Sequence, residues 1–144
     1  MNISFRKIDE NNWRECIKLR VGNDQKRFVA TNENGLALAY VHKEMNPLAI
    51  YNEELMVGFI MYARDPDDGI FYINRFMIDE KFQGKGFGRE ALAMLLNELR
   101  ERKIEKVDIL HKPDNFHAIK LYQSLGFELT EMKVGDDVIS TVKL

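Results

Sequence analysis

The chain has 144 residues, with 21 lysines and arginines against 23 aspartates and glutamates, so its formal charge at neutral pH is −2. A chain of this length buries enough surface to form one domain with a core of its own, and we expect a single domain over residues 1–144. The near balance of charge gives no general attraction to nucleic acid or to an anionic membrane, so neither is expected as a partner. Any anionic ligand must be bound by a local arrangement of residues.

The single cysteine, Cys16, excludes an intrachain disulfide, which suits a reducing compartment. The first residues lack the apolar run of a signal peptide, and no stretch approaches the roughly 20 apolar residues of a membrane-spanning helix. We therefore expect a cytoplasmic protein. Three histidines and one cysteine without paired spacing provide no ligand set, so no metal is expected.

The first half of the chain predicts a strand, two short helices and a hairpin. Alternating apolar and polar residues predict a strand over 3–6. Asn12 is an expected N-terminal cap for a first helix, and a second helix is expected over 35–41. Two apolar strands with a three-residue turn between them then form a hairpin, at 47–51 and 55–63.

The second half alternates long strands with periodic helices. A strand over 70–78 leads through a glycine-rich segment into a helix whose apolar residues recur at helical spacing over 89–102. A strand, a second periodic helix and a closing hairpin follow, at 106–110, 115–124, 128–133 and 138–143. The strands on either side of the first long helix are expected to be parallel. The order predicts an α/β (α+β) fold, with a mixed, mostly antiparallel central sheet flanked by helices.

The glycine-rich segment Gln83-Gly84-Lys85-Gly86-Phe87-Gly88 lies between a predicted strand and a predicted helix. Its glycines let the backbone approach a ligand closely, and the helix that follows begins with unpaired N–H groups and the positive end of its dipole. These features favour binding of a phosphate or pyrophosphate, to which Lys85 and Arg89 add positive charge.

The segment matches one of three well-known phosphate-binding patterns. The P-loop string is absent from the chain, and the dinucleotide fingerprint fails because the third glycine arrives one residue early. The pattern Gln/Arg-x-x-Gly-x-Gly/Ala is matched by Gln83, Gly86 and Gly88. Taken alone, the segment is equally compatible with an ordinary glycine-rich turn.

A second motif, Asn115-Phe116-His117-Ala118-Ile119-Lys120-Leu121-Tyr122-Gln123-Ser124-Leu125-Gly126-Phe127, opens the next predicted helix. The pair of motifs resembles the GNAT superfamily of acetyl-coenzyme A-dependent N-acetyltransferases, over about residues 70–127. The resemblance implies the GNAT fold, an enzyme, and acetyl-CoA as its co-substrate. It also admits a homodimer, in which the closing strands add to a partner's sheet.

The resemblance further implies roles for individual residues. Backbone groups around Met77 and Ile78 are expected to bind the pantetheine arm of the coenzyme, Asn115 to hydrogen-bond it, and Ala118 to leave room for it. The pyrophosphate is expected on the loop amides from Gln83 through Gly84, Lys85, Gly86, Phe87 and Gly88 to Arg89.

Tyr122 is the expected catalytic residue, the acid that protonates the departing thiolate. A phenol with a pKa near 10 keeps its proton at neutral pH and can give it to a thiolate at close range.

The acceptor is expected to be a primary amine. The strings 55–59, 75–80 and 82–86 are similar to bacterial spermine/spermidine acetyltransferases, which points to a polyamine. Because a polyamine carries several positive charges, its site should present carboxylates. The carboxylates considered are Glu33, Glu53, Glu54, Asp65, Asp67 and Asp68. A protein N-terminus, a lysine or another small amine remains an alternative acceptor, and a non-catalytic module that senses acyl-CoA is an alternative function.

The general base is not assigned by the sequence. Asn74 stands where polyamine acetyltransferases often carry an acidic residue, and asparagine cannot accept a proton at neutral pH. His111 and His117 are open candidates for this role, because imidazole is a common general base. We expect His117 to be structural or to lie near the coenzyme, and His111 to be an ordinary surface histidine.

Overall fold

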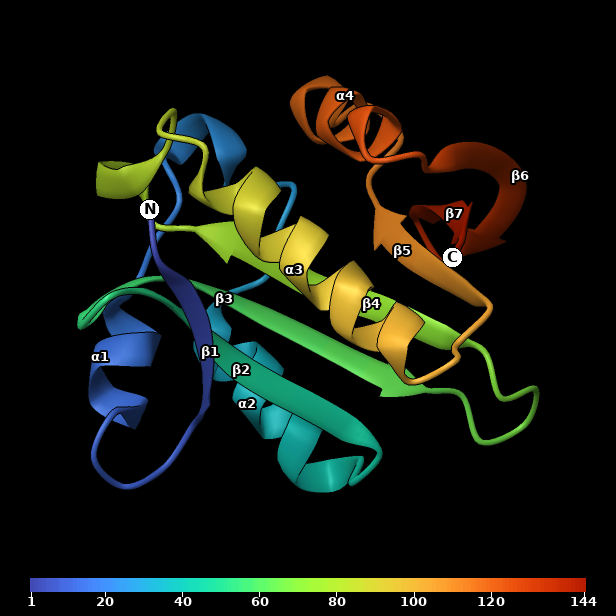
Figure 1. The fold of residues 1–144 in the computed structure, drawn as a ribbon. Helices are drawn as coiled ribbons and strands as arrows, with labels where there is room; N and C mark the ends of the chain where they lie inside the picture. The colour runs from blue at the N-terminus through green and yellow to red at the C-terminus, as the bar shows by residue number, and fades with distance from the viewer.

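The computed structural model describes all residues, 1–144, and is built around one seven-stranded sheet with the order β1-β2-β3-β4-β5-β7-β6 (Figure 1). The strands are β1 Ile3–Lys7, β2 Met45–Asn52, β3 Leu55–Arg64, β4 Phe71–Ile78, β5 Lys106–His111, β6 Glu128–Val134 and β7 Asp137–Lys143. The helices are α1 Trp13–Lys18, α2 Asn32–Val41, α3 Phe87–Glu101 and α4 Phe116–Ser124, with short 3-10 turns at Asn23–Gln25 and Glu80–Phe82. Only β4 and β5 pair in parallel, so the predicted mixed, mostly antiparallel sheet is confirmed.

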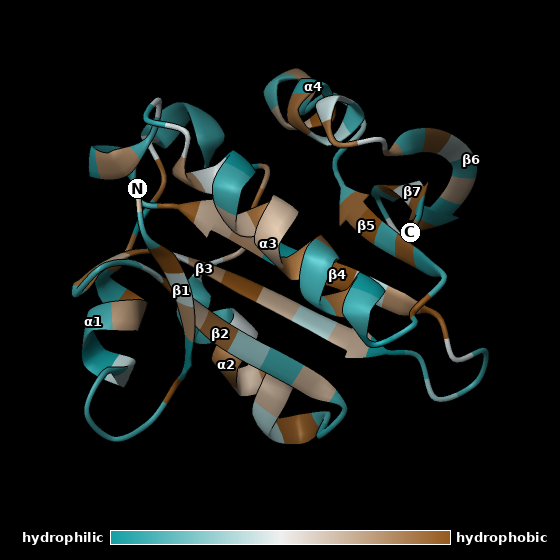
Figure 2. Cartoon of the chain, in the orientation of Figure 1, coloured by the Kyte–Doolittle hydropathy of each residue, from teal (hydrophilic) through white to brown (hydrophobic).

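The sheet separates two hydrophobic cores, because successive side chains of a strand point to opposite faces. On one face Ile60 of β3 and Ile73 of β4 pack with the apolar stripe of α3. On the other face Phe59 of β3 packs with Cys16 and Leu19 against the side covered by α1 and α2. Figure 2 shows the apolar residues concentrated along the central strands, between these layers of helices.

Three local predictions on helix starts need correction. α2 begins at Asn32, three residues earlier than expected, because the Thr31 hydroxyl accepts a hydrogen bond from the Asn34 N–H and caps the helix. α3 begins at Phe87 rather than at residue 89. Asn12 precedes α1 but makes no side-chain cap, since its amide instead bonds backbone groups in the preceding turn.

The parallel pairing of β4 with β5 is short. It joins Phe71–Ile73 to Val107–Ile109 and then stops, although β4 runs on to Ile78. The register between β3 and β4 shifts at the same point, so that Asn74 has no residue opposite it and forms a bulge. The carboxyl-terminal half of β4 therefore diverges from β5, and its edge has no strand partner.

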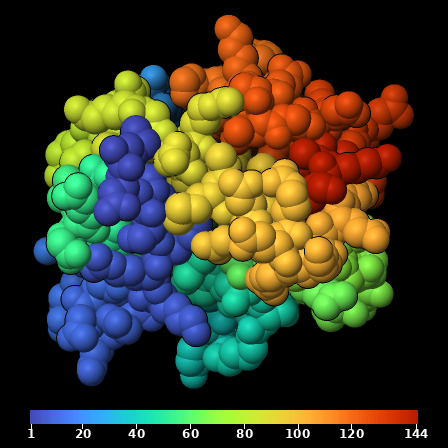
Figure 3. Space-filling model, in the orientation of Figure 1, coloured from blue at the N-terminus to red at the C-terminus, as the bar shows by residue number.

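The two helices that follow these strands lie on the same face of the molecule. Figures 1 and 3 show α3 lying between the N-terminal segment on one side and α4 on the other. Both helices begin near the carboxyl ends of β4 and β5, so their N-terminal ends flank the opening between the strands. None of the helices combines the length and apolarity needed to cross a membrane.

Gly58 allows β3 to approach the segment of β4 that borders this opening. A Cβ atom at this position would collide with the Met77 carbonyl oxygen and come within 2.8 Å of Ile78 Cδ1. We expect Gly58→Ala to lower the free energy of unfolding by about 1–3 kcal/mol, because β4 must shift to admit the methyl group. Urea denaturation measures the change. Gly88→Ala is the matched control, since its Cβ would meet Ile78 and Phe76 at ordinary distances of 3.4 and 3.5 Å, and an equal loss there would contradict the explanation.

Candidate active site

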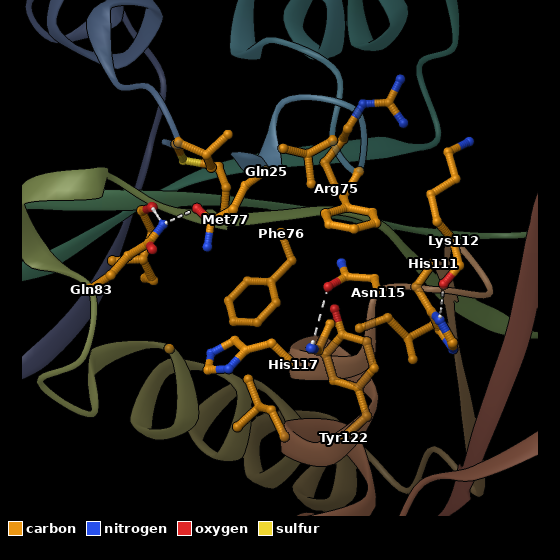
Figure 4. Close-up of a pocket in the computed structure, with 18 of the residues that line it drawn as sticks. Gln25, Arg75, Phe76, Met77, Gln83, His111, Lys112, Asn115, His117 and Tyr122 are labelled. Carbon is orange, nitrogen blue, oxygen red and sulfur yellow. Dashed lines mark hydrogen bonds between the residues drawn. The ribbon is translucent and has the colours of Figure 1, made fainter. Parts of the chain in front are cut away.

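A cavity of about 890 Å³ occupies the opening between β4 and β5 (Figure 4). It is bordered by the N-terminal ends of α3 and α4 and by the segment that precedes α2. Eleven of the twelve site residues predicted from the sequence line it: Met77, Ile78, Gln83, Gly84, Gly86, Phe87, Gly88, Arg89, Asn115, Ala118 and Tyr122. The twelfth, Lys85, is exposed and lies outside the lining.

The glycine-rich loop presents a row of backbone donors to one end of the cavity. Gly84 and Gly86 have φ angles of 75° and 87°, which side chains rarely tolerate. Gly86 is the N-terminal cap of α3, and as a glycine it has no side chain that could accept a hydrogen bond. The first hydrogen bond of the helix runs from the Glu90 N–H to the Gly86 carbonyl. The three N–H groups before Glu90 are therefore free to bind an anion, with the positive end of the helix dipole behind them.

The Gln83 side chain attaches this loop to β4. Its Nε2 donates to the Ile78 carbonyl at 2.8 Å and to Gln25 Oε1 at 2.9 Å (Figure 4). The first residue of the motif thus has a role that its sequence position did not reveal, because both partners are fixed only by the fold. The contact also connects the loop with the segment preceding α2. Arg89 adds a further connection, since its guanidinium bonds the Ser124 hydroxyl of α4.

The start of α4 faces the cavity from the opposite side. Asn115 caps the helix by accepting a hydrogen bond from the Ala118 N–H at 3.4 Å, so its amide NH2 is left for other partners (Figure 4). Ala118 presents only a methyl group to the cavity beside it.

Tyr122 lies one turn further along α4 and is 5% exposed. Its ring is packed among Phe76, His111 and Phe127, with centroid distances of 6.5, 5.5 and 5.8 Å. No protein group hydrogen-bonds to its hydroxyl, which points toward the middle of the cavity in Figure 4. Burial raises the pKa of Tyr122 above its ordinary value of 10, so the phenol is protonated at neutral pH.

His111 is buried, at 5% exposure, so the expectation of a surface histidine was wrong. Its Nδ1 lies 3.0 Å from the Lys112 carbonyl and its Nε2 lies 2.8 Å from Ser140 Oγ. Because a carbonyl oxygen can only accept, Nδ1 carries the proton and Nε2 accepts from the Ser140 hydroxyl. Both ring nitrogens are engaged, and His111 is not free to serve as a base. His117, at the start of α4, lines the cavity.

Comparison with known proteins identifies this arrangement. Residues 6–127 match the model of the Acetyltransferase (GNAT) family. The chain belongs to this family. It is 31% identical over 89% of its length to the spermine/spermidine N(1)-acetyltransferase of Bacillus subtilis strain 168, of which the match also covers 89%.

Solved structures share the GNAT fold with this acetyltransferase. A domain from Methanocaldococcus jannaschii superimposes with a TM-score of 0.80 at 23% identity, over 99% of both chains. The spermidine N-acetyltransferase from Vibrio cholerae, solved with CoA and spermine, superimposes with a TM-score of 0.77 at 14% identity, over 99% of this chain and 95% of that one.

The cavity of this acetyltransferase is strongly cationic, which the overall charge of the chain concealed. Its lining carries six cationic side chains and one carboxylate, that of Asp137. None of the six carboxylates considered from the sequence lines it. Glu33 and Glu54 instead form ion pairs with Arg20 and Arg6 elsewhere. The cations come from five different segments of the chain: Lys26, Arg27, Arg75, Arg89, Lys112 and Lys120.

Asn74 and Arg75 line the cavity from the middle of β4. The Asn74 side-chain oxygen is buried without a hydrogen bond, and its backbone carbonyl accepts from the Arg75 guanidinium at 2.9 Å. The guanidinium also donates to Asn34 Oδ1 at 2.9 Å and has no carboxylate bonded to it. Burial lowers the pKa of Arg75, and the negative charge of Asp137 opposes this shift. Asp137 itself lines the cavity.

Cys16 is fully buried in the core on the α1 and α2 side of the sheet and lies outside the cavity. Burial, with a smaller contribution from the negative charges of Glu33 and Glu15, raises the pKa of its thiol from 9.0 to about 12. A buried neutral thiol is not a nucleophile.

This burial predicts how the protein responds to alkaline pH. Above pH 9 the unfolded chain loses the thiol proton before the folded chain does, so the free energy of unfolding should fall as the pH rises from 9 to 12. Cys16→Ala should reduce that slope, as measured by urea denaturation across this pH range. At pH 8 a disulfide reagent should modify Cys16 only in urea, and rapid modification of the folded protein would contradict the assignment.

Proposed function

We propose that this acetyltransferase transfers the acetyl group of acetyl-CoA to a primary amine of a polyamine. The observation that carries the proposal is the convergence on one cavity of a glycine-rich anion site, the free edge of β4 and a protonated tyrosine. The similarity to the Bacillus subtilis spermine/spermidine N(1)-acetyltransferase supports the choice of acceptor.

The residues present fit acetyl-CoA. Free N–H groups at the start of α3 would hold the pyrophosphate of the coenzyme. The positive charges that would face the phosphates of the coenzyme come from Arg89, Lys26 and Lys120, which line the cavity. The unpaired edge of β4 near Met77 would offer backbone groups to the amides of the pantetheine arm, as an edge strand does to an added peptide. When bound, acetyl-CoA supplies a thioester as the acyl donor.

Tyr122 acts as the general acid. Its hydroxyl has no partner within the protein, so the proton is available for the sulfur of the departing coenzyme. The hydrophobic packing around the ring fixes its orientation and keeps the phenol neutral until a thiolate develops beside it.

The acceptor amine loses its proton without a dedicated side-chain base. Asn74 cannot accept a proton, and both nitrogens of His111 are occupied. Arg75 has no carboxylate hydrogen-bonded to it, and its positive charge would favour the neutral form of an amine bound beside it, because like charges disfavour ionisation. The proton then leaves to water.

Replacing Tyr122 by phenylalanine tests the general acid. We expect Tyr122→Phe to lower kcat by about 100-fold, because the thiolate leaves without a proton donor. Coenzyme A binding, measured by calorimetry, should change little. Tyr40→Phe is the control, since Tyr40 is 77% exposed and lies outside the cavity. Equal kcat values for wild type and Tyr122→Phe would exclude the assigned role.

An acceptor panel tests the substrate class. Thiol release from acetyl-CoA should saturate with spermidine and spermine, and kcat/KM for these should exceed that for butylamine and for peptides with free N-termini or lysines. Turnover restricted to peptides would exclude the polyamine and retain the acetyltransferase. Coenzyme binding without turnover on any amine would favour the sensing module.

A further inference from the structure

Asp137 is the one carboxylate that an acceptor inside the cavity can reach. It is the first residue of β7, directly after the turn that joins β6 to β7, and its side chain is 32% exposed. On sequence grounds it belongs to a solvated hairpin turn. The fold brings that turn beside the carboxyl-terminal end of β5, where Asp137 lines the cavity.

The Asp137 carboxylate forms an ion pair with a lysine of the same cavity. Lys112 Nζ lies 2.8 Å from Asp137 Oδ1, and the Lys112 side chain is 33% exposed. In Figure 4 Lys112 and Arg75 lie on the same side of the cavity, at the end away from Gln83. The pair is thus accessible from the cavity rather than sealed in a core, and water screening makes such a pair weak.

We propose that Asp137 binds an ammonium group of the acceptor remote from the nitrogen that is acetylated, and that Lys112 occupies this carboxylate until the acceptor arrives. The inference rests on the proposed polyamine acetyltransferase function. It assigns to Asp137 a role in selecting acceptors that carry a second positive charge.

The exchange is chemically balanced, because a primary ammonium of the acceptor replaces the primary ammonium of Lys112. The carboxylate keeps a charge-assisted hydrogen bond throughout, and the displaced Lys112 ammonium, whose side chain is 33% exposed, is hydrated by water instead. A monoamine has no second ammonium with which to displace Lys112, so the site adds nothing to its affinity. The other charges of the lining are positive and repel an acceptor with several ammonium groups more than a monoamine, so a preference for the polyamine requires the carboxylate of Asp137.

Opposite changes in KM distinguish this role from a structural one. Asp137→Asn should raise KM for spermidine by about tenfold, because the acceptor loses its charged partner. Lys112→Met should lower KM for spermidine, because the internal competitor is removed. KM for butylamine should stay within about twofold in both variants, since a single charge pair contributes only to the acceptor that contacts it.

Asp136→Asn is the matched control. It removes the same charge from the neighbouring position, and Asp136 does not line the cavity, so KM for spermidine should be unchanged. Calorimetry of spermidine binding to the enzyme saturated with CoA measures affinity without turnover. The affinity should be highest for Lys112→Met, intermediate for the wild type and lowest for Asp137→Asn. Thermal unfolding of each variant verifies that it is folded.

The outcomes separate this inference from the proposed function. If the wild type acetylates spermidine but Asp137→Asn and Lys112→Met shift its KM in the same direction, or shift butylamine equally, the ion pair is structural and the inference is overturned. If the wild type acetylates no polyamine, the proposed acceptor falls, and the inference falls with it.

Discussion

The site depends on the early end of the pairing between β4 and β5. After three residue pairs the strands separate, and the bulge at Asn74 turns the rest of β4 away from its neighbour. The separation leaves backbone groups of β4 without partners in the sheet, in a position where a ligand can bind them. It also brings the N-terminal ends of α3 and α4 to the two sides of one cavity. The proposed sites of the coenzyme, the general acid and the acceptor therefore all depend on a single interruption in the sheet.

The sequence predicted those parts of the site that are formed by contiguous residues. The loop over 83–88 and the motif around Tyr122 each combine a helix start with residues whose chemistry is readable locally, and eleven of the twelve predicted residues do line the cavity. The contacts of Gln83 with Gln25, of His111 with Ser140 and of Lys112 with Asp137 join residues 25 to 58 positions apart. No local pattern encodes such pairs, so His111 was misplaced at the surface and Asp137 was overlooked.

The charge of the cavity could not be predicted from the composition of the whole chain either. A chain with a formal charge of −2 nonetheless gathers six cations around one opening. Lys112 and Arg27 are paired with Asp137 and Asp114, whereas the six carboxylates considered from the sequence all lie outside the lining. The formal charge of the whole chain therefore does not reveal the charge of one cavity. The proposed pairing of a polyanionic donor with a polycationic acceptor requires both positive and negative charges in one cavity. The lining, with six cations and one carboxylate, meets the requirement of the donor far more fully than that of the acceptor.

The hydrogen bonds of Gln83 determine at which stage the glycine-rich loop becomes ordered. Because the side chain holds the loop to β4 and to the segment before α2, the conformational entropy of this glycine-containing loop is lost during folding. The ligand does not have to order it again, so more of the interaction with the phosphates remains as affinity. Weakening this attachment would convert a rigid anion receptor into one that folds around its ligand, with slower association and a larger entropic penalty on binding.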